Sequence, residues 1–434
     1  MSKDVIKLGL LGAGTVGGGV LQVLEKNAAD ILEKVGKPIK VKKILVRRLE
    51  EYQAQYGDKY EFTTDIQNIL EDPEIDMVVE LMGRVHPAKE YIEAALYQGK
   101  HVVTANKDVI AEYGEELFKL AADKKCDLLF EGSVCGGIPI IGPMKSTMAA
   151  NQLKKIMGIV NGTTNYMLSK MANEHLDYDA VLKEAQEKGY AESDPTADVG
   201  GLDAARKVAI LATLAFNMPV SLDDVAVEGI ENIEQCDIKY ASDMGYAVKL
   251  LGISKYTEEY GVSAKVTPTM LPLDHPLASV NGVFNALYVK GDAIGEAMFL
   301  GLGAGRLPTA SSVCGDILEC ARNILSKSTG KTTIPIYREK RLCPLEYQQS
   351  PCYIRMQVTD KPGALAAIAA AFGAQDVSLR NVLQNGREGH DAEIVVITHS
   401  VSEANLSMAL QLLKVLPVVK KVCCVIRVED KSLA

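Results

Sequence analysis

Acidic side chains and one lysine crowd the segment ahead of an apolar run. The segment, residues 190–207, reads YAESDPTADVGGLDAARK, and VAILATLAF follows it. Asp203 and Lys207 are spaced i, i+4, which places them on one face of a predicted helix. Since that helix is apolar nearly all round, its charged groups are costly unless they meet a ligand or each other. With Glu192 and Asp198 nearby, the cluster suits a small zwitterionic substrate. The alternative is an acidic helix-capping loop with a surface ion pair.

A glycine-rich turn near the N-terminus has the form G-x-G-x-x-G. Its residues are Gly12, Ala13, Gly14, Thr15, Val16 and Gly17. The turn follows an apolar strand and opens a helix, so its backbone N–H groups and the helix dipole can hold a pyrophosphate. We therefore expect a dinucleotide site. The alternative is a glycine turn that binds nothing.

Two arginines follow the second predicted strand, where dinucleotide sites meet the ribose. NAD sites usually place Asp or Glu there, whereas this chain has Arg47 and Arg48. Guanidinium groups suit a 2′-phosphate, which predicts that NADP is preferred and NAD is possible. The alternative is a pair of surface arginines, with Glu50 and Glu51 close by.

Two further loops follow predicted strands. Lys107 lies just past the strand in VVTANK, where it can reach cofactor or substrate or remain a solvated loop lysine. The loop EGSVCGGIP begins with Glu131, which can hold a cation together with backbone carbonyls. Cys135 in that loop has no adjacent histidine to activate it, so we expect a structural role.

Composition excludes several classes of protein. Hydrophobic residues make up 47% and charged residues 24% of the 434 residues, which is typical of a globular chain. The net charge of −9 argues against nucleic acid and membrane partners, and no apolar run approaches the ~18 residues of a membrane span. The nine scattered cysteines indicate a reducing cytoplasm.

The elements that position these groups alternate strand and helix in the N-terminal part. We expect strands at 5–11, 39–46, 76–81, 101–104 and 127–131, with helices at 15–35, 87–98 and 111–124. This order predicts a parallel sheet with helices on both faces. Beyond Gly132 we expect an α+β domain with helices at 140–150, 166–174, 178–188 and 202–216, and strands at 261–267, 286–290 and 297–300.

The C-terminal part has a third pattern. Strands at 353–358, 378–384, 392–399 and 419–428 and helices at 364–372 and 404–416 give βαββαβ, a ferredoxin-like order. The turn Asp360-Lys361-Pro362-Gly363 leads into a helix whose N–H groups can hold an amino-acid carboxylate.

With these motifs in view, the chain resembles the long bacterial form of homoserine dehydrogenase with a C-terminal ACT domain. The resemblance covers essentially the whole length. It rests on GAGTVG, VVTANK, EGSVCGGIPII, NGTTNYML, GYAESDPTADVGGLDAARK, GLGAGRLPTA and DKPGALAAIA. It implies a Rossmann-type NAD(P)-binding domain over residues 1–131, a homoserine-binding catalytic domain over 132–325, a linker over 326–351 and an ACT regulatory domain over 352–430.

The resemblance also implies roles for single residues. Lys207 is expected to exchange the hydroxyl proton, and Lys107 to assist at the nicotinamide. Glu192, Asp198 and Asp203 would bind homoserine, with Tyr190, Gly162 and Thr163 lining the pocket. Thr104, Gly303 and Gly305 would contact the cofactor. A monovalent cation, usually sodium, would lie on the Glu131 side chain and the carbonyls of Val134, Gly136 and Ile138. Arg48 departs from the family, which often has Asp at this position.

The implied activity is reversible hydride transfer between L-homoserine and L-aspartate 4-semialdehyde, in threonine and methionine biosynthesis. Threonine is the expected effector at the ACT domain, and a homodimer or homotetramer is the expected assembly. The alternative is that this domain is purely structural or serves oligomerisation. An alternative from another class is a non-catalytic NADP-dependent amino-acid sensor. A third reading, an acyl-phosphate-reducing dehydrogenase, requires a Cys135 thiolate.

Overall fold

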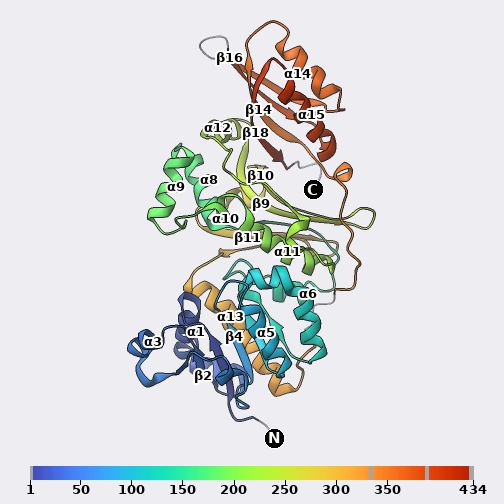
Figure 1. Cartoon of the computed structure of the whole chain (residues 1–434). Coiled ribbons are helices and arrows are strands. Elements are labelled where there is room, and N and C mark those ends of the chain that lie inside the picture. The colour runs from blue at the N-terminus through green and yellow to red at the C-terminus, as the bar shows by residue number, and fades with distance from the viewer. Residues whose placement is uncertain (1–2, 332–335, 387–390, 430–434) are drawn as a thin grey trace. The chain divides into compact units, whose positions relative to one another are not determined.

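The structure is a computed structural model that describes residues 3–331, 336–386 and 391–429 (Figure 1). By contacts the chain divides into two units, each built from separate stretches of sequence. The first comprises residues 1–153, 209–223 and 285–340, and the second 154–208, 224–284 and 341–434. None of the described helices is long and apolar enough to span a membrane.

The first unit contains a parallel sheet in the order β3-β2-β1-β4-β5-β6. Its strands are β1 (Ile6–Leu11), β2 (Ile39–Leu45), β3 (Glu61–Thr63), β4 (Met77–Glu80), β5 (His101–Thr104) and β6 (Leu128–Leu129). This order reverses direction between β1 and β4, and ligands of such sheets bind beyond the carboxyl ends of the strands at that point. The predicted Rossmann-type sheet is therefore confirmed.

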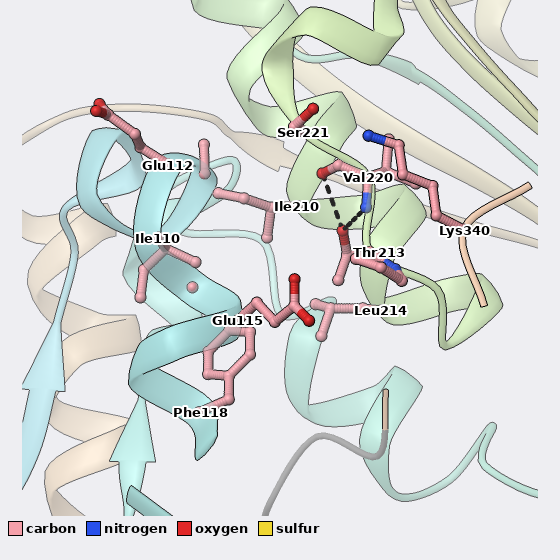
Figure 2. Close-up of a pocket in the computed structure, with 13 residues that line it drawn as sticks. Ile110, Glu112, Glu115, Phe118, Ile210, Thr213, Leu214, Val220, Ser221 and Lys340 are labelled. Atoms are coloured by element: carbon pink, nitrogen blue, oxygen red, sulfur yellow. Dashed lines mark hydrogen bonds between the residues drawn. The ribbon is translucent and has the colours of Figure 1, made fainter. Parts of the chain in front are cut away.

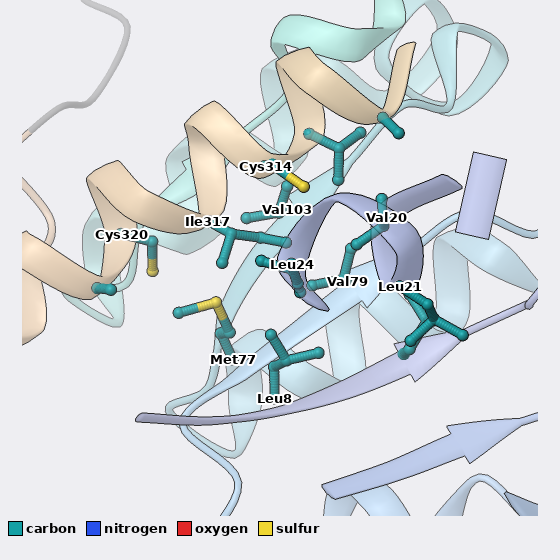
Figure 3. Packing of buried hydrophobic residues seen from close by; sticks show 14 of the residues in the cluster. Leu8, Val20, Leu21, Leu24, Met77, Val79, Val103, Cys314, Ile317 and Cys320 are labelled. Atoms are coloured by element: carbon teal, nitrogen blue, oxygen red, sulfur yellow. The ribbon is translucent and has the colours of Figure 1, made fainter. Parts of the chain in front are cut away.

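The first unit also contains helices. They are α1 (Thr15–Lys26), α2 (Ala28–Val35), α3 (Leu49–Tyr56), α4 (Gln67–Leu70), α5 (Ala88–Tyr97), α6 (Lys107–Asp123), α7 (Ile141–Lys145) and α13 (Arg306–Ser326), and two strands, β11 (Phe284–Gly291) and β12 (Gly295–Leu302), precede α13. Figure 3 shows Val20 and Leu24 of α1 packing with Leu8 of β1 and Ile317 of α13 in one buried cluster. Helix α13, distant in sequence, thus completes the core of the cofactor domain.

The second unit holds the acid–lysine segment and the C-terminal part. Its strands are β7 (Leu153–Ile159), β8 (Val225–Val227), β9 (Tyr246–Thr257), β10 (Gly261–Pro272), β13 (Gln349–Ser350), β14 (Cys352–Thr359), β15 (Leu379–Gly386), β16 (Asp391–Thr398), β17 (Val401–Ser402) and β18 (Val419–Val428). Its helices are α8 (Gly162–Glu174), α9 (Tyr178–Glu187), α10 (Thr196–Val199), α12 (Gln235–Asp243), α14 (Ala364–Gly373), α15 (Glu403–Val415) and the start of α11 (Leu202–Phe216).

The C-terminal strands pair in the order β18-β14-β16-β15, all antiparallel. Helices α14 and α15 cover one face through a shared apolar core that includes Ile354, Ile368 and Leu406. This confirms the predicted βαββαβ domain. Strand β18 also pairs in parallel with β10, through Thr269 with Arg427 and Met270 with Val428. One sheet therefore runs from β7 through β9 and β10 into the C-terminal domain.

The structure corrects four predicted helices. Those expected to begin at residues 111 and 166 begin earlier, α6 at Lys107 and α8 at Gly162, because the side chains of Asn106 and Asn161 cap them there. The helix expected over 15–35 is two helices, because Asn27 (φ −106°, ψ 17°) leaves helical geometry between them. The helix expected over 140–150 ends at Lys145, where the hydroxyls of Ser146 and Thr147 bond back to the carbonyls of Gly142 and Pro143. Strands β7 and β9 and helices α3, α12 and α13 were not predicted.

The predicted linker over 326–351 includes residues 332–335, which lie outside the described residues. Its residues from Arg341 onward belong to the second unit, where Val262 of β10 exchanges backbone hydrogen bonds with Arg341 and Cys343. The rings of Tyr260 and Tyr347 stack there with centroids 4.0 Å apart. The domain boundaries stay a prediction.

Candidate active site

The glycine turn has the geometry that a pyrophosphate requires. Gly12 has φ +93°, and its N–H donates to the Leu45 carbonyl at 3.0 Å, which closes the turn. A Cβ at Gly14, the N-cap of α1, would meet nothing within 4 Å, so the backbone there is open to a ligand. A Cβ at Gly17 would lie 2.1 Å from the Gly12 carbonyl oxygen, so only glycine lets α1 pack this closely on the turn. Each glycine thus has a separate role.

The two arginines after β2 are solvent-exposed. Arg48 caps α3, and its Nη1 lies 3.0 Å from Glu51 Oε1 in an i, i+3 ion pair. The side chain of Arg48 is 74% exposed, so this pair contributes little to stability and a ligand phosphate can compete with it. The role of Arg47 and Arg48 at the ribose stays a prediction.

A buried carboxyl that the sequence analysis missed lies where β4 and β5 end. Glu80 is fully buried, accepts the Thr104 hydroxyl at 2.6 Å and accepts the Met82 N–H at 2.7 Å. Burial raises the pKa of Glu80 above its usual value. Thr104 Oγ1 in turn accepts the N–H of Asn106, which caps α6. Lys107, half-buried, is the first residue of α6 rather than a loop residue, so this network fixes the start of the helix that carries it.

The acid–lysine cluster forms in the second unit as the sequence suggested. Lys207 Nζ lies 2.6 Å from Asp203 Oδ2 and 2.7 Å from the Val160 carbonyl oxygen. Lys207 is 9% exposed, and the apolar residues that follow it on α11 are largely buried. Asn161, which the sequence analysis did not assign, donates to Asp198 Oδ1 at 2.7 Å and to Asp203 Oδ2 at 2.9 Å. Asn161 directly precedes the predicted residues Gly162 and Thr163, but nothing in that motif indicates its contact with the carboxylates.

The remaining predicted substrate residues lie around the start of α8. Gly162 begins the helix, and the Thr163 hydroxyl donates to the Tyr190 carbonyl at 2.6 Å. The Tyr190 ring, 45% exposed, contacts the Tyr166 ring edge-on with centroids 5.0 Å apart. Glu192 is exposed on the loop before α10. The structure therefore gathers Asp198, Asp203 and Lys207 tightly and leaves Tyr190 and Glu192 at the rim.

Glu131 in the predicted cation loop has partners of its own. Its Oε1 accepts the N–H groups of Ile140 (2.6 Å) and Ile141 (2.8 Å), and its Oε2 accepts that of Gly142 (2.6 Å). The carboxylate therefore caps α7. Its backbone N–H donates to Asp316 Oδ2 at 2.8 Å, and burial raises the pKa of Asp316 well above its usual range.

The rest of that loop is shaped by Cys135 (φ +53°) and Gly136 (φ +44°), two consecutive left-handed residues. Cys135 is 1% exposed, which leaves its thiol inaccessible to a substrate. The Gly303 carbonyl oxygen would lie 2.6 Å from a Cβ on Gly136, and Gly137 N–H donates to the Leu302 carbonyl. Asn285 Oδ1, also near Gly303, is buried without a hydrogen-bond partner among the described residues. Carbonyl and amide oxygens of this kind suit a hard cation.

Two other features of the first unit lie apart from the predicted site residues. A cavity of about 180 Å³ lies between α6 and the end of α11, lined by residues that include Phe118, Thr213 and Lys340 (Figure 2). His101, Asp127 and Cys320 bring ligand-type atoms within 4.8 Å. However, His101 Nδ1 accepts the Asp127 N–H, which in a neutral ring leaves the proton on Nε2. This trio therefore fits hydrogen bonding better than metal coordination.

Comparison with known families divides the chain into three matched regions. Residues 12–131 match the NAD-binding domain of homoserine dehydrogenase, residues 139–318 match homoserine dehydrogenase, and residues 353–418 match the ACT domain. These matches favour the enzyme over the sensor alternative.

Whole-length relatives carry the same name. Homoserine dehydrogenase of Bacillus subtilis is 44% identical, covering 98% of this chain and 99% of the relative. Homoserine dehydrogenase of Corynebacterium glutamicum is 42% identical, covering 98% of this chain and 96% of the relative. The crystal structure of a homoserine dehydrogenase from Thiobacillus denitrificans superposes with a TM-score of 0.94 at 38% identity, covering 99% of this chain and 100% of that one.

Identity at this level over the full length is sufficient to show the family. The chain therefore belongs to the homoserine dehydrogenase family, oxidoreductases that act on a CH–OH group with NAD(P), and it carries a C-terminal ACT domain.

Proposed function

We propose that the enzyme oxidises L-homoserine to L-aspartate 4-semialdehyde reversibly, with Lys207 exchanging the proton of the substrate hydroxyl. Bound NADP supplies the hydride acceptor. As the hydride leaves the carbinol carbon, the hydroxyl proton passes to the neutral amine of Lys207, and the reverse reaction returns it. The observation that carries this assignment is the placement of Lys207 Nζ between Asp203 Oδ2 and the Val160 carbonyl. These two contacts fix the position of the amine, and Lys207 is only 9% exposed.

The carboxylates nearby account for recognition of the substrate. Homoserine is a zwitterion, so Asp198, Asp203 and the rim residue Glu192 are the groups that would bind its ammonium. Gly162, Thr163 and Tyr190 would line the pocket. Lys107 would assist at the nicotinamide end of the cofactor site.

NADP is the cofactor we propose to be preferred. Arg47 and Arg48 follow β2, and both are solvent-exposed, so their guanidinium groups can reach a ligand phosphate. Neither position carries the acidic residue that usually binds the ribose 2′-hydroxyl in NAD sites. A related solved structure is that of a hyperthermophilic archaeal homoserine dehydrogenase in complex with NADPH, which is 27% identical and has a TM-score of 0.63 over 73% of this chain. Thr104, Gly303 and Gly305 would complete the site.

A sodium ion is the proposed monovalent cation. The carbonyls of Val134, Gly136 and Ile138 would hold it, and Glu131 would set the loop in place through α7. Because Glu131 already accepts three N–H groups, its side chain is better suited to shaping the loop than to binding the ion alone. The ion would stabilise the loop against Gly303 rather than act as a Lewis acid.

For the C-terminal domain we propose amino-acid regulation, with threonine as the effector. The enzyme would act in the cytoplasm, in threonine and methionine biosynthesis, as a homodimer or homotetramer. The support is the ACT match over residues 353–418 and the position of Gly363 (φ +87°) as N-cap of α14.

The test is absorbance at the NADPH band after mixing enzyme, NADP and homoserine. We expect NADPH to accumulate and to be consumed again when aspartate 4-semialdehyde is added. Binding of NADP and threonine without any absorbance change would instead support the sensor alternative.

A further inference from the structure

We infer that Asn161 is a positioning residue of the reaction, which holds the carboxylates of Asp198 and Asp203 side by side and thereby places Asp203 against Lys207. The inference rests on the proposed role of Lys207. The role we infer for Asn161 requires no contact with substrate or cofactor. Asn161 acts through the two carboxylates.

Every polar group of the Asn161 side chain is used. Its Nδ2 donates one hydrogen to Asp198 Oδ1 at 2.7 Å and one to Asp203 Oδ2 at 2.9 Å. Its Oδ1 accepts the backbone N–H of Thr164 at 2.9 Å and the hydroxyl of Thr164 at 3.0 Å. Because carboxylates accept and an N–H donates, the amide cannot be flipped without losing these bonds. The residue is 6% exposed, so water does not readily replace them.

The same oxygen of Asp203 serves both the amide and the lysine. Asp203 Oδ2 accepts from Asn161 Nδ2 and from Lys207 Nζ. The residue before Asn161, Val160, accepts from Lys207 Nζ through its carbonyl. Val160 therefore holds the Lys207 ammonium directly through its carbonyl, and Asn161 holds it indirectly by fixing Asp203 Oδ2. A small displacement of Val160 and Asn161 would move the proton-exchanging group.

The amide also acts against repulsion between two acids. Burial raises the pKa of Asp198; the Asn161 hydrogen bond lowers it, and neighbouring Asp203 raises it. The charged groups that face Asp198 are Asp203, Lys207 and Glu192. Without a donor between them, Asp198 and Asp203 would tend to share a proton. A protonated pair would bind an ammonium substrate poorly and would release Lys207 from its acceptor.

A helix-capping role alone is the competing account, because Asn161 is the N-cap of α8. Asn161→Ser separates the two roles. Serine is an equally favoured N-cap, so the cap on Thr164 is kept, whereas both donors to the carboxylates are lost. Asn161→Asp also keeps the cap and adds a third carboxylate. Thr164→Val is the matched control, since it removes one bond to Asn161 Oδ1 and leaves the donors in place.

We expect Asn161→Ser to lower kcat about 10²-fold, as for a displaced catalytic group, and to shift the acidic limb of the kcat/KM profile to higher pH. Asn161→Asp should lower kcat further, and Thr164→Val should leave the profile unchanged. A folded Asn161→Ser enzyme with wild-type kcat and pH profile would reduce Asn161 to a helix cap and overturn the inference.

A second readout does not depend on catalysis. Because the folded chain holds the Asp198 proton more tightly than the unfolded chain does, the free energy of unfolding falls as pH rises through the folded pKa of Asp198. Loss of the Asn161 hydrogen bond raises that pKa further, so in urea unfolding between pH 3 and pH 7 this fall should extend to a higher pH in Asn161→Ser than in wild type. Coincident curves would show that the amide does not govern the carboxylates. The two proposals can be told apart. If Lys207→Ala retains activity, Lys207 is not the proton carrier. If the unfolding curves of wild type and Asn161→Ser still separate, Asn161 nevertheless controls the protonation of the two carboxylates.

Discussion

The guanidinium of Arg355 on β14 and the carboxylate of Asp237 on α12 form two parallel hydrogen bonds, Nε to Oδ1 at 2.6 Å and Nη2 to Oδ2 at 2.9 Å. Both residues are buried, at 2% and 0% exposure, and the Tyr353 hydroxyl donates to the same carboxylate. Arg355 also contacts Glu393 of β16 at 3.3 Å. The ACT domain is thus joined to the neighbouring helix by a buried, bidentate ion pair.

Removing one partner of this pair should destabilise the protein strongly. We expect Asp237→Ala to lower the free energy of unfolding by about 3–5 kcal/mol, because the Arg355 charge is left buried beside fewer acceptors. Urea unfolding provides the measurement. The double variant Asp237→Leu/Arg355→Met is the control and should recover much of the loss. A single variant as stable as wild type would show that water reaches Arg355.

Lys207→Ala should lower kcat by about 10²–10⁴, the range for loss of a general acid or base. NADPH fluorescence titration should give an unchanged Kd, since Lys207 is not assigned to the cofactor. Near-normal turnover in a folded variant would exclude Lys207 as the proton carrier.

Replacing Arg47 and Arg48 together by serine should raise KM for NADP about 10- to 150-fold, as expected for losing a charge-assisted hydrogen bond worth about 1.5–3 kcal/mol. KM for NAD should change little. Glu51→Gln is an informative companion, because it frees Arg48 from its ion pair without removing the guanidinium. Equal effects on both cofactors would mean that neither arginine contacts the 2′-phosphate.

A chain that ends at Ser350 should lose threonine inhibition, and its hydride-transfer activity should depend on its stability. Truncation removes β18 from the edge of β10 and leaves Asp237 buried without Arg355. We therefore expect the truncated chain to be more stable when it also carries Asp237→Asn. Sedimentation and initial rates with and without threonine would be measured on both. A folded truncated enzyme that threonine still inhibits would place the effector site outside the ACT domain.

Lys249 predicts how the free energy of unfolding depends on pH. Its Nζ donates to Asn165 Oδ1 (3.2 Å), the Val280 carbonyl (2.6 Å) and Asn281 Oδ1 (3.0 Å), and burial lowers its pKa to about 8. Between pH 8 and 10.5 the unfolded chain holds more protons than the folded one, so the free energy of unfolding rises with pH. Relative to Lys249→Met, wild type should gain on the order of 3 kcal/mol across that window. Parallel curves would mean that the three acceptors keep Lys249 charged.

Local patterns in the sequence were sufficient for the cofactor turn and the ACT domain. Gly12, Gly14 and Gly17 belong to a motif whose meaning is set by its flanking strand and helix. In the C-terminal part, β14 alternates apolar and more polar residues (CYIRMQVT). The acid–lysine cluster could also be predicted, because Asp203 and Lys207 lie on one helix.

The missed features depend on contacts distant in sequence. Glu80 meets Thr104 only because β4 and β5 pair in register. Asn161 meets Asp198 and Asp203 through tertiary packing that its own motif does not encode. Helix α13 was missed because its small and polar residues, such as Ser311, Ser312 and Gly315, obscure the apolar period of the face that packs on α1.

The place of β18 in the sheet has a consequence for biosynthesis. This strand lies between β10 and β14, yet the ribosome makes it long after β10. Until it emerges, Thr269 and Met270 present an unpaired strand edge, and edges of that kind recruit other chains. The nascent catalytic domain is therefore expected to need chaperone protection until the ACT domain has been translated, so that slowing translation through residues 352–428 should increase aggregation in the cell.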